Sequence, residues 1–485
     1  MRLTGAIRRS CFLYKELQLA SDDYLRLAAD SMPDLCSLTE QIGGGQKGGY
    51  KVSRPIKVAI AGLGNRGRDN YAKCAKLHPD KMEIAAVADI DPKKVELVAE
   101  EYHLPKEACF ASAEEMLKQE KLADVMIIAT QDRQHVGHAV AALEKGYHLL
   151  LEKPVSPEAD ECRRLADTAK RCGRKVVVCH VLRYTPIYQK VKELLDEGVI
   201  GDVVSIMASE NVGWYHQAHS FVRGNWANSK ETSPMILQKC CHDMDLCLWL
   251  ADKKCESLTS YGDTYLFKKE NAPKGCAARC LDGCGVKEDC PFDAEKIYLD
   301  NEETGYRRGN RQWPLEVLVP SGPTEEKIMD ALREGRYGRC VYHCDNDVVD
   351  HQVVNLRMTD GTTMSFTMCA FTPEISRYAR FMGTKGEIRV NMTGRLKDCE
   401  ISIRRFKSEM PVETVNVEDL ADDFSGHGGG DERMLVEFLD VISGEKEENS
   451  YVTSLDRSLE SHYCALAAEY SRTHGGCPVK LADFA

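Results

Sequence analysis

The chain has 485 residues, 43% of them hydrophobic and 29% charged, which is ordinary for a globular protein and excludes a wholly disordered one. That length predicts two or three domains, since a domain typically holds ~100–200 residues. A net charge of −12 argues against nucleic-acid binding. No apolar run approaches the ~18 residues of a membrane helix. The unusual feature is a total of 21 cysteines, which are either disulfides or reduced thiols, some of them held by a metal.

The first 53 residues match no domain pattern. They contain a weak helical stretch at Tyr14–Ala29 and a glycine-rich piece at Gly43–Gly49, so we expect a flexible extension without an assigned role. The amino terminus lacks an apolar core of the length that a signal peptide requires, which predicts a cytoplasmic protein. Because thiols stay reduced in the cytosol, disulfides become the weaker interpretation of the cysteines.

A dinucleotide-binding fold is predicted to begin at residue 54. Ile56–Ala61 has the β-branched pattern of a buried parallel strand, and the loop Gly62-Leu63-Gly64-Asn65-Arg66-Gly67 separates it from a helix predicted at Arg68–Leu77. The first glycine of such a loop permits a tight turn, the second lets a pyrophosphate approach the backbone, and the third lets the helix pack on the strand. The phosphates are expected at the helix start, where the helix dipole favours negative charge.

An acidic residue follows the next predicted strand. Ile84–Ala88 ends at Asp89, which lies 22 residues past Gly67. A carboxylate there accepts hydrogen bonds from the adenosine ribose and repels a 2′-phosphate. This predicts NAD rather than NADP, although Lys93 and Lys94 moderate the preference. Turn glycines in another α/β fold are the alternative, but strand, glycines, helix and acid together favour a dinucleotide site.

The elements that follow continue to alternate between strand and helix, as in a doubly wound parallel sheet. The predicted strands are Ala123–Thr130, Tyr147–Leu151 and Lys175–Cys179, and the predicted helices are Gln134–Lys145 and Pro157–Arg171. Ligands of such sheets bind beyond the carboxyl ends of the strands. The residues at these ends are Asp89, Thr130, Lys153 and His180.

Several motifs resemble the glucose-fructose oxidoreductase / inositol dehydrogenase / MocA (Gfo/Idh/MocA) family of NAD(P)-dependent oxidoreductases. The motifs are Gly62–Gly67, Ala129–His135, Glu152-Lys153-Pro154, Arg183–Pro186, Gly198–Val203 and Gly383–Ile388. The resemblance covers roughly residues 54–475, and Glu152-Lys153-Pro154 is its most specific part.

The resemblance implies an α/β protein with two domains. A Rossmann domain with a doubly wound parallel sheet is expected over residues 54–180, and an α+β domain with an open, mostly antiparallel sheet over residues 181–485. The second domain is expected to bind substrate and to form a homo-oligomer, a dimer or tetramer. Its predicted elements are strands at Val353–Met358, Thr363–Met368, Gly386–Val390 and Glu400–Arg405, a hairpin turn at Asp360-Gly361, and helices at Asp431–Ile442 and Leu455–Arg472.

The family reaction is hydride transfer between a nicotinamide and a carbinol carbon of a sugar, sugar derivative or cyclitol. It needs a base for the hydroxyl proton and a cation or donor for charge on oxygen. The resemblance assigns Lys153 to the reacting hydroxyl and His242 to the base, since histidine titrates near neutral pH. The family has an Asp four residues earlier on the same helix face. Here that residue is Gln238, which cannot take a proton, and Lys239 beside it either gives cationic help or is solvated.

Further residues are assigned to the cofactor and the substrate. The cofactor set is Gly62, Gly64, Asn65, Arg66, Gly67, Asp89, Thr130, Gln131, His135, Glu152, Lys153 and Arg183. The substrate set is Lys153, Tyr184, Tyr215, Arg223, Trp226, His242 and His427. Aromatic faces with polar groups suit a carbohydrate, but they also suit an ordinary loop packed on a sheet. The glycines around His427 either allow a ligand to approach or only shape a turn.

A cysteine-rich insertion is predicted at about 265–345, without a core of its own. Cys276, Cys280, Cys284 and Cys290 lie in one short loop, and His343 follows between two later cysteines, 340 and 344. The first four thiols either close a structural zinc site or stay free, and an iron–sulfur cluster is a lesser alternative. The spacings differ from those of common zinc ribbons, and the family as a whole requires no metal.

Three functions remain open. The leading hypothesis is an NAD-dependent dehydrogenase of a sugar, sugar derivative or cyclitol. The second is a glycosidase that retains its NAD, oxidises the sugar transiently and eliminates the aglycone. The third is a non-catalytic relative that binds the cofactor, against which Lys153 and His242 speak. Neither nucleic acid nor membrane is an expected partner.

Overall fold

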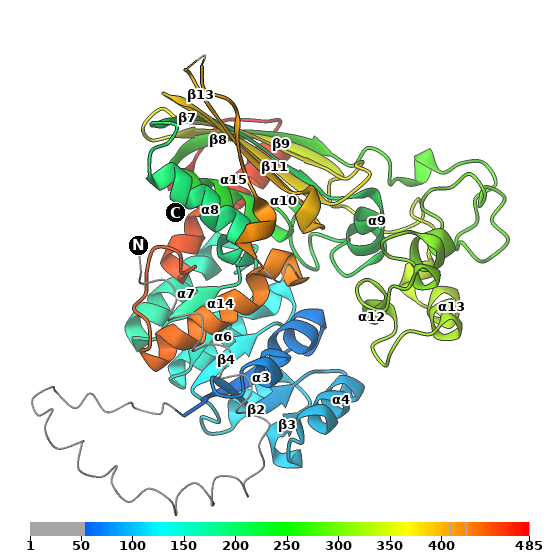
Figure 1. The fold of residues 1–485 in the computed structure, drawn as a ribbon. Helices are drawn as coiled ribbons and strands as arrows, with labels where there is room; N and C mark the ends of the chain where they lie inside the picture. The colour runs from blue at the N-terminus through cyan, green and yellow to red at the C-terminus, as the bar shows by residue number, and fades with distance from the viewer. Residues whose placement is uncertain (1–53, 408, 422–424, 485) are drawn as a thin grey trace, which may run out of the picture. The chain divides into compact units, whose positions relative to one another are not determined.

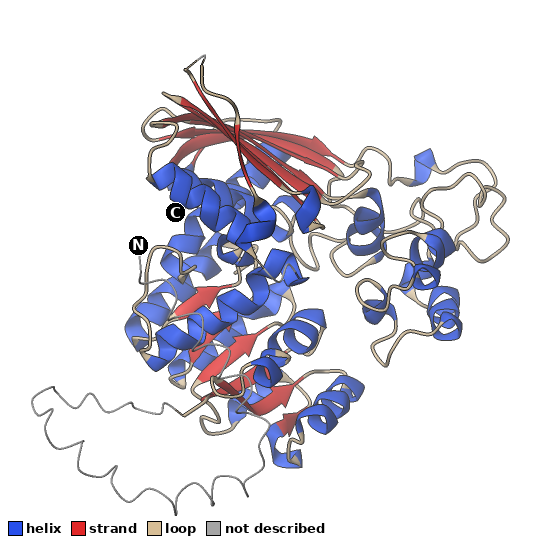
Figure 2. Cartoon of the chain, in the orientation of Figure 1, coloured by secondary structure: helices blue, strands red, loops and turns tan. Residues whose placement is uncertain are grey.

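The computed structural model describes residues 54–407, 409–421 and 425–484. The predicted helix at Tyr14–Ala29 and the glycine-rich piece at Gly43–Gly49 lie outside these residues. Arg54–Ala485 forms one compact unit, and Figure 2 shows its strands gathered in two separate sheets. In the part of the chain that the structure describes, no helix is both long and apolar enough to cross a bilayer.

The first sheet has six strands in the order β3-β2-β1-β4-β5-β6, and every neighbouring pair is parallel. The strands are β1 (Ile56–Ala61), β2 (Met82–Ala88), β3 (Cys109–Phe110), β4 (Val125–Ile128), β5 (His148–Leu151) and β6 (Val176–Val178). The central strands are buried on both faces, as their continuous apolar runs predict. The predicted doubly wound sheet is confirmed, and its carboxyl ends meet at one edge.

Helices cover both faces of this sheet. They are α3 (Cys74–Leu77), α4 (Pro92–Tyr102), α5 (Ala113–Lys118), α6 (His135–Glu144) and α7 (Ala159–Cys172), with α14 (Ser425–Ser443) from the end of the chain. Met434 and Phe438 of α14 share a buried cluster with Ile60 and Tyr71, so this late helix completes the core of the first sheet. Residues far apart in the chain thereby meet beside the glycine loop.

The second sheet has nine strands in the order β14-β13-β12-β11-β7-β10-β9-β8-β15. They are β7 (Val203–Asn211), β8 (Cys255–Asp263), β9 (His351–Met358), β10 (Thr363–Cys369), β11 (Ser376–Gly383), β12 (Gly386–Thr393), β13 (Glu400–Arg405), β14 (Glu413–Val415) and β15 (Val479–Lys480). Only β7 and β10 pair in parallel, so the predicted, mostly antiparallel sheet is confirmed. The hairpin at Asp360-Gly361 is also confirmed, with Arg357 opposite Thr363.

One face of the second sheet is buried. Val354 and Leu356 of β9 and Phe366 of β10 point into it and are almost fully buried. Figure 1 shows α15 (Leu455–Thr473) and α8 (Pro186–Asp196) on this side, and α11 (Cys241–Ala251) packs between α15 and α8. Short helices α9 (Trp214–His216) and α10 (Met235–Gln238) precede α11. The helix α11 therefore lies between the second sheet and the edge of the first.

The segment 264–350 between β8 and β9 contains no strand, and its two α-helices are α12 (Leu315–Leu318) and α13 (Glu325–Glu334). The expectation that this insertion lacks a core is wrong. Phe292, Tyr298 and Leu315 belong to a separate apolar cluster, which also includes Ile328 and Leu332 of α13. The apolar residues of this segment are spaced irregularly, which is why the sequence did not reveal a shared core.

Candidate active site

The glycine loop follows β1 at the carboxyl edge of the first sheet. Gly62 has a φ of +93°, and a Cβ there would overlap the carbonyl oxygen of Ala129 in the neighbouring strand end. Gly64 is different, because a Cβ there would meet nothing within 4 Å. The helical turn begins at Asn65 (η2, Asn65–Ala72), earlier than the predicted Arg68. Open space at Gly64 before a helix start fits the phosphates of a dinucleotide.

Asp89 is tied to this loop through its carboxylate. Its Oδ2 accepts from the backbone N–H of Leu63 (2.6 Å), and its Oδ1 accepts from that of Asp91 (2.9 Å). The Lys94 Nζ lies 3.9 Å from the Asp89 Oδ1, so a cation is close to this carboxylate, as the sequence predicted. Asp89 is therefore fixed at the end of β2, beside the loop, where a ribose is expected.

Arg66 pairs with protein groups. Its Nε donates to Glu152 (2.5 Å), and its Nη2 donates to Asp431 (2.6 Å) and Tyr71 (2.7 Å). Burial raises the pKa of Glu152, but the charges of Arg66 and Lys153 outweigh burial and hold that pKa below its usual value. The Glu152 of the Glu-Lys-Pro motif thus orients the loop arginine and stays ionised.

The end of β4 and the Glu-Lys-Pro turn are joined by a buried histidine. The ring nitrogens of His135 lie 2.7 Å from the carbonyl oxygen of Pro154 and 3.1 Å from that of Thr130. The Thr130 hydroxyl contacts His138 (3.1 Å), and Gln131 caps the helical turn before α6. These contacts fix the backbone on either side of Lys153.

Lys153 points from the first sheet to α10. Its Nζ donates to the backbone carbonyl oxygen of Gln238 (2.6 Å). An ammonium has three N–H donors, and this is its one hydrogen bond within the described residues. The contact is to a backbone atom, which any residue supplies, so the replacement of the family aspartate by Gln238 leaves this anchor intact.

Four histidines form a row beside Lys153. The ring centroids of His462 and His180 are 5.3 Å apart, those of His180 and His242 5.5 Å, and those of His242 and His427 6.2 Å. Within the described residues, three ring nitrogens lack a hydrogen-bond partner: both nitrogens of His180 and the Nδ1 of His242. Buried polar atoms without partners need an explanation, and a bound substrate is one.

Burial lowers the pKa of His242 well below its usual value. The charge of Lys153 lowers the pKa further, followed by His180, Arg377 and His427. His242 is therefore neutral at physiological pH, and a neutral imidazole can accept a proton. The row ends at His427, whose Nδ1 lies 2.9 Å from Asp431 and whose side chain is 42% exposed.

Lys239 belongs to a buried charge network. Its Nζ is 3.3 Å from Glu210 of β7, and Arg377 of β11 joins Glu210 (2.8 Å) to Asp243 of α11 (3.0 Å). Burial lowers the pKa of Lys239 against the attraction of Glu210, and burial raises that of Asp243 to about 7 against the charge of Arg377. The sequence did not reveal Glu210 and Arg377, because each lies on a strand that patterning left unassigned.

Other predicted residues are held in the protein interior. Arg183 donates twice to Asp245 (2.7 and 2.5 Å), and both are buried. The backbone N–H of Thr453 donates to the Tyr184 hydroxyl (3.0 Å), and Tyr184 is 1% exposed. Trp226 packs against the main core, and its Nε1 has no partner in the described part of the chain.

Two of the predicted substrate residues pack against the insertion. The Tyr215 hydroxyl donates to Glu303, and Tyr215 lies in the apolar cluster of that segment. Arg223 is fully buried, and it donates to carbonyl oxygens and to Cys280. The structure therefore brings Lys153, His242 and Lys239 together with the glycine loop edge but keeps these two residues with the cysteines.

Two family models match the chain, and both belong to Gfo/Idh/MocA. The model "Oxidoreductase family, NAD-binding Rossmann fold" matches residues 56–180, and "Oxidoreductase family, C-terminal alpha/beta domain" matches residues 192–481.

Individual proteins are similar as well. A Bacillus subtilis protein designated oxidoreductase YteT is 24% identical over 395 residues, which are 78% of this chain and 87% of that protein. The 2,7-anhydro-N-acetylneuraminate hydratase of Escherichia coli is 27% identical over 207 residues, 43% of this chain and 52% of that protein. A solved inositol dehydrogenase homologue from Azotobacter vinelandii, complexed with NAD+, is 14% identical with a TM-score of 0.62 and covers 90% of this chain and 100% of its own. The chain belongs to the Gfo/Idh/MocA family of NAD(P)-dependent oxidoreductases.

Proposed function

We propose that the chain is an NAD-dependent dehydrogenase of a carbinol carbon in a sugar, sugar derivative or cyclitol. The observation that carries the proposal is that Lys153 lies near His242, whose Nδ1 has no hydrogen-bond partner among the described residues, beside the glycine loop edge. In this proposal residues 54–180 hold the cofactor and residues 181–485 hold the substrate.

The residues around the loop fit NAD. Gly64 leaves open space at a helix start, and Asp89 is fixed at the end of the neighbouring strand. The carboxylate of Asp89 favours a ribose hydroxyl over a 2′-phosphate, so we propose NAD rather than NADP. When bound, the nicotinamide takes or returns the hydride.

The protein groups handle the proton and the charge on oxygen. The Lys153 ammonium uses one of its three N–H donors for the Gln238 carbonyl, which leaves two donors for the substrate hydroxyl. His242, neutral because it is buried, takes the hydroxyl proton as the hydride leaves carbon. The Lys153 ammonium stabilises the negative charge that develops on the oxygen. Lys239, held by Glu210, adds positive potential nearby.

A glycosidase that retains its NAD is the second candidate. His427 supports it, since this half-exposed histidine extends the row of His242 and contacts the ionised Asp431, so a second acid–base group is at hand. Burial raises the pKa of Asp431, and the charges of Arg66 and His427 lower it below its usual value. A relative that is named as a hydratase fits the idea that members of this family differ in their net reaction.

We also propose a cytoplasmic homo-oligomer. The 19 cysteines of the described residues are all unpaired, which suits a reducing compartment. The outer face of the second sheet exposes Met207, Tyr261 and Val353, which suits contact with a second copy of the chain. Light scattering with size-exclusion chromatography would give the number of chains.

The test is a substrate panel with added NAD, after mass spectrometry of the small molecules that copurify. We expect NADH absorbance with at least one polyol, sugar, glycoside or inositol, and NADH formation about 10²- to 10³-fold less efficient with the His242→Asn variant. Release of an aglycone without net NADH would favour the glycosidase. Bound NAD without turnover on the whole panel would contradict both enzymatic functions.

A further inference from the structure

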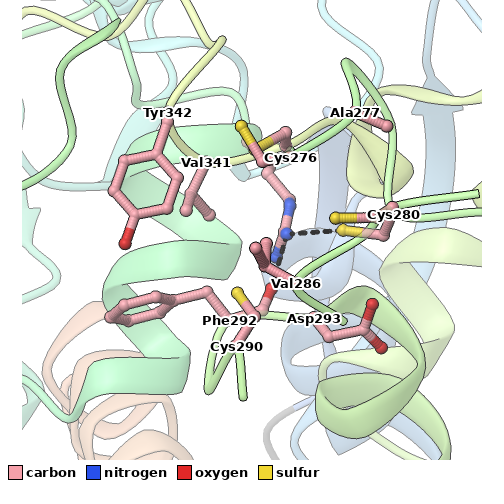
Figure 3. Close-up of a pocket in the computed structure, with 12 residues that line it drawn as sticks. Cys276, Ala277, Cys280, Val286, Cys290, Phe292, Asp293, Val341 and Tyr342 are labelled. Atoms are coloured by element: carbon pink, nitrogen blue, oxygen red, sulfur yellow. Dashed lines mark hydrogen bonds between the residues drawn. The ribbon is translucent and has the colours of Figure 1, made fainter. Parts of the chain in front are cut away.

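The insertion between β8 and β9 contains cysteines that the proposed reaction does not use. Cys276, Cys280, Cys284, Cys290 and Cys340 line one cavity of about 10 Å³. Figure 3 shows the side chains of three of them, Cys276, Cys280 and Cys290, around this cavity. Such a volume holds about one water-sized sphere. A space for a single small particle with sulfur atoms around it is suited to a metal ion.

A short antiparallel pairing brings two distant cysteines to one face. Arg279 forms a bridge with Arg339, and the backbone N–H groups of Cys280 and Cys340 donate across it (3.0 and 2.9 Å). Side chains alternate along a strand, so the residues next to a bridged pair point to the same side. Cys280 and Cys340 therefore lie on the face opposite to the two bridged arginines.

Cys276, Cys340 and His343 already have nearly the spacing of metal ligands. Their ligand atoms all lie within 4.8 Å of one another, and the Cys276 Sγ is 3.5 Å from the His343 Nε2. Tetrahedral zinc with bonds of about 2.3 Å to sulfur and about 2.0 Å to nitrogen puts ligand atoms roughly 3.5 Å apart. These three residues thus need only small side-chain movements to bind an ion, and Cys280 lines the same cavity as Cys276 and Cys340.

A buried cation beside these thiols lacks an anion. Arg223 is fully buried, its Nη2 donates to Cys280 Sγ (3.5 Å), and its other partners are carbonyl oxygens. Its Nη1 has no partner, and no carboxylate pairs with it, among the residues that the structure describes. Burying an uncompensated charge is costly. A group of thiolates held by a metal would supply the missing negative charge.

We propose that Cys276, Cys280, Cys340 and His343 bind one structural zinc ion. Three thiols release their protons and form three Zn–S bonds, and the neutral imidazole forms the fourth bond. Three thiolates and Zn²⁺ have a net charge of −1, which offsets the charge of Arg223. A histidine ligand favours zinc, because iron–sulfur clusters are held mainly by cysteines.

This set differs from the four consecutive cysteines that the sequence suggested. It keeps Cys276 and Cys280, replaces Cys284 and Cys290, and joins two stretches that are about 60 residues apart in the sequence. Zinc there would close the insertion in the way a disulfide closes a loop in a secreted protein.

The first experiment uses the full chain, purified without chelator under reducing conditions and then exposed to zinc chloride. We expect about one zinc per chain by elemental analysis and X-ray absorption with sulfur and nitrogen neighbours in a ratio of about three to one. No bound zinc after this loading would overturn the proposal. Iron with acid-labile sulfide in the fresh protein would also overturn it.

Variants then identify the ligands. Cys276→Ser, Cys340→Ser and His343→Ala should each lose zinc, whereas Cys284→Ser and Cys290→Ser, the matched controls in the same loop, should retain it. Zinc loss in the two controls with retention in Cys340→Ser would overturn this ligand set. NAD affinity checks that each variant is folded, since the glycine loop belongs to the other sheet. Zinc content is measured without turnover, so the outcome is independent of the proposed dehydrogenase function.

Discussion

The candidate active site and the cysteine cluster of the insertion are both buried and polar, but they differ in which groups lack partners. Around the active site the buried arginines have carboxylate partners, as Arg66 has Asp431 and Arg183 has Asp245. Within the described residues, ring nitrogens of His180 and His242 lack hydrogen-bond partners, and burial lowers the pKa values of both histidines, so these rings are neutral. Beside the cysteines of the insertion, the buried cation Arg223 has no carboxylate partner among the described residues, and its Nη1 has no hydrogen-bond partner there. Burying a neutral imidazole without a hydrogen-bond partner costs a modest free energy, so the site can exist without substrate. Burying a guanidinium without an anion costs much more, so this charge needs a permanent partner.

The two regions meet at aromatic contacts. The Trp313 ring is 4.8 Å from that of His216, and the Tyr337 ring stacks on His219 at 4.7 Å. Burial lowers the pKa of His216, and the charge of Lys239 is the next cause. The insertion therefore forms a wall next to the charge network of the active site.

The largest expected effect is the loss of turnover in Lys153→Met. The variant removes the cation that holds the reacting oxygen, so we expect kcat/KM to fall about 10³-fold. Zinc content and NAD affinity should stay near wild type, which would separate the two regions. Lys145→Met, at a surface lysine that contacts the Gln119 carbonyl, is the control. Retained turnover in Lys153→Met would refute the role of this lysine.

His242→Asn should lower kcat/KM about 10²- to 10³-fold, because the base is gone. The exposed His103, at a left-handed φ of 54° that Asn tolerates, provides the matched control His103→Asn. The pKa of His242 is lowered, so the wild-type profile should remain flat as pH falls to about 6.5, the usual histidine value. An acid limb that begins above that pH would contradict the assignment of a neutral base.

Asp89→Ser should shift cofactor preference toward NADP by roughly 10- to 100-fold, because the variant removes a negative charge that would repel a 2′-phosphate. NAD binding should also weaken, since the carboxylate anchors Leu63. Asp91→Ser is the control, because serine can replace Asp91 as the cap of α4. The ratio of kcat/KM values for the two cofactors is the measurement. An unchanged ratio would remove the support for NAD preference.

The smallest effect per residue concerns acid stability. Burial lowers the pKa values of His180, His216, His219, His242 and His462, those of His219 and His462 to about 3. Below pH 6.5 the unfolded chain binds protons that these folded histidines do not, so the free energy of unfolding falls as pH falls. The loss is up to about 1.4 kcal/mol per histidine per pH unit.

Urea unfolding at several pH values between 7.5 and 5.5 would measure this slope. His462→Gln should reduce the slope, because it removes one buried imidazole. His103→Gln, at an exposed site, should leave the slope unchanged. A stability that stays constant across this range would contradict the buried, neutral state of the histidine row.

Much of the first sheet was predictable because its strands are continuous apolar runs. β1 has the predicted bounds, Ile56–Ala61. Gly62 packs so closely on the backbone of Ala129 that no Cβ fits there, as the motif requires. β13 also has its predicted bounds. Strands β7 and β11 were missed, because their polar residues interrupt the alternation. Glu210 and Arg377 are two of these polar residues, and they pair with each other in the charge network.

The amino-acid sequence alone was enough to identify the family, the glycine loop, the Glu-Lys-Pro turn and the cysteine-rich insertion. These features are local, and each depends on the conformation or chemistry of a few neighbouring residues. Only the tertiary structure showed that Arg66 pairs with Asp431, 365 residues away, and that Cys340 joins Cys276. It also showed that Lys153 is anchored by a backbone carbonyl, whichever side chain residue 238 has. Such partnerships depend on how buried surfaces pack, and a residue pattern along one chain does not contain that information.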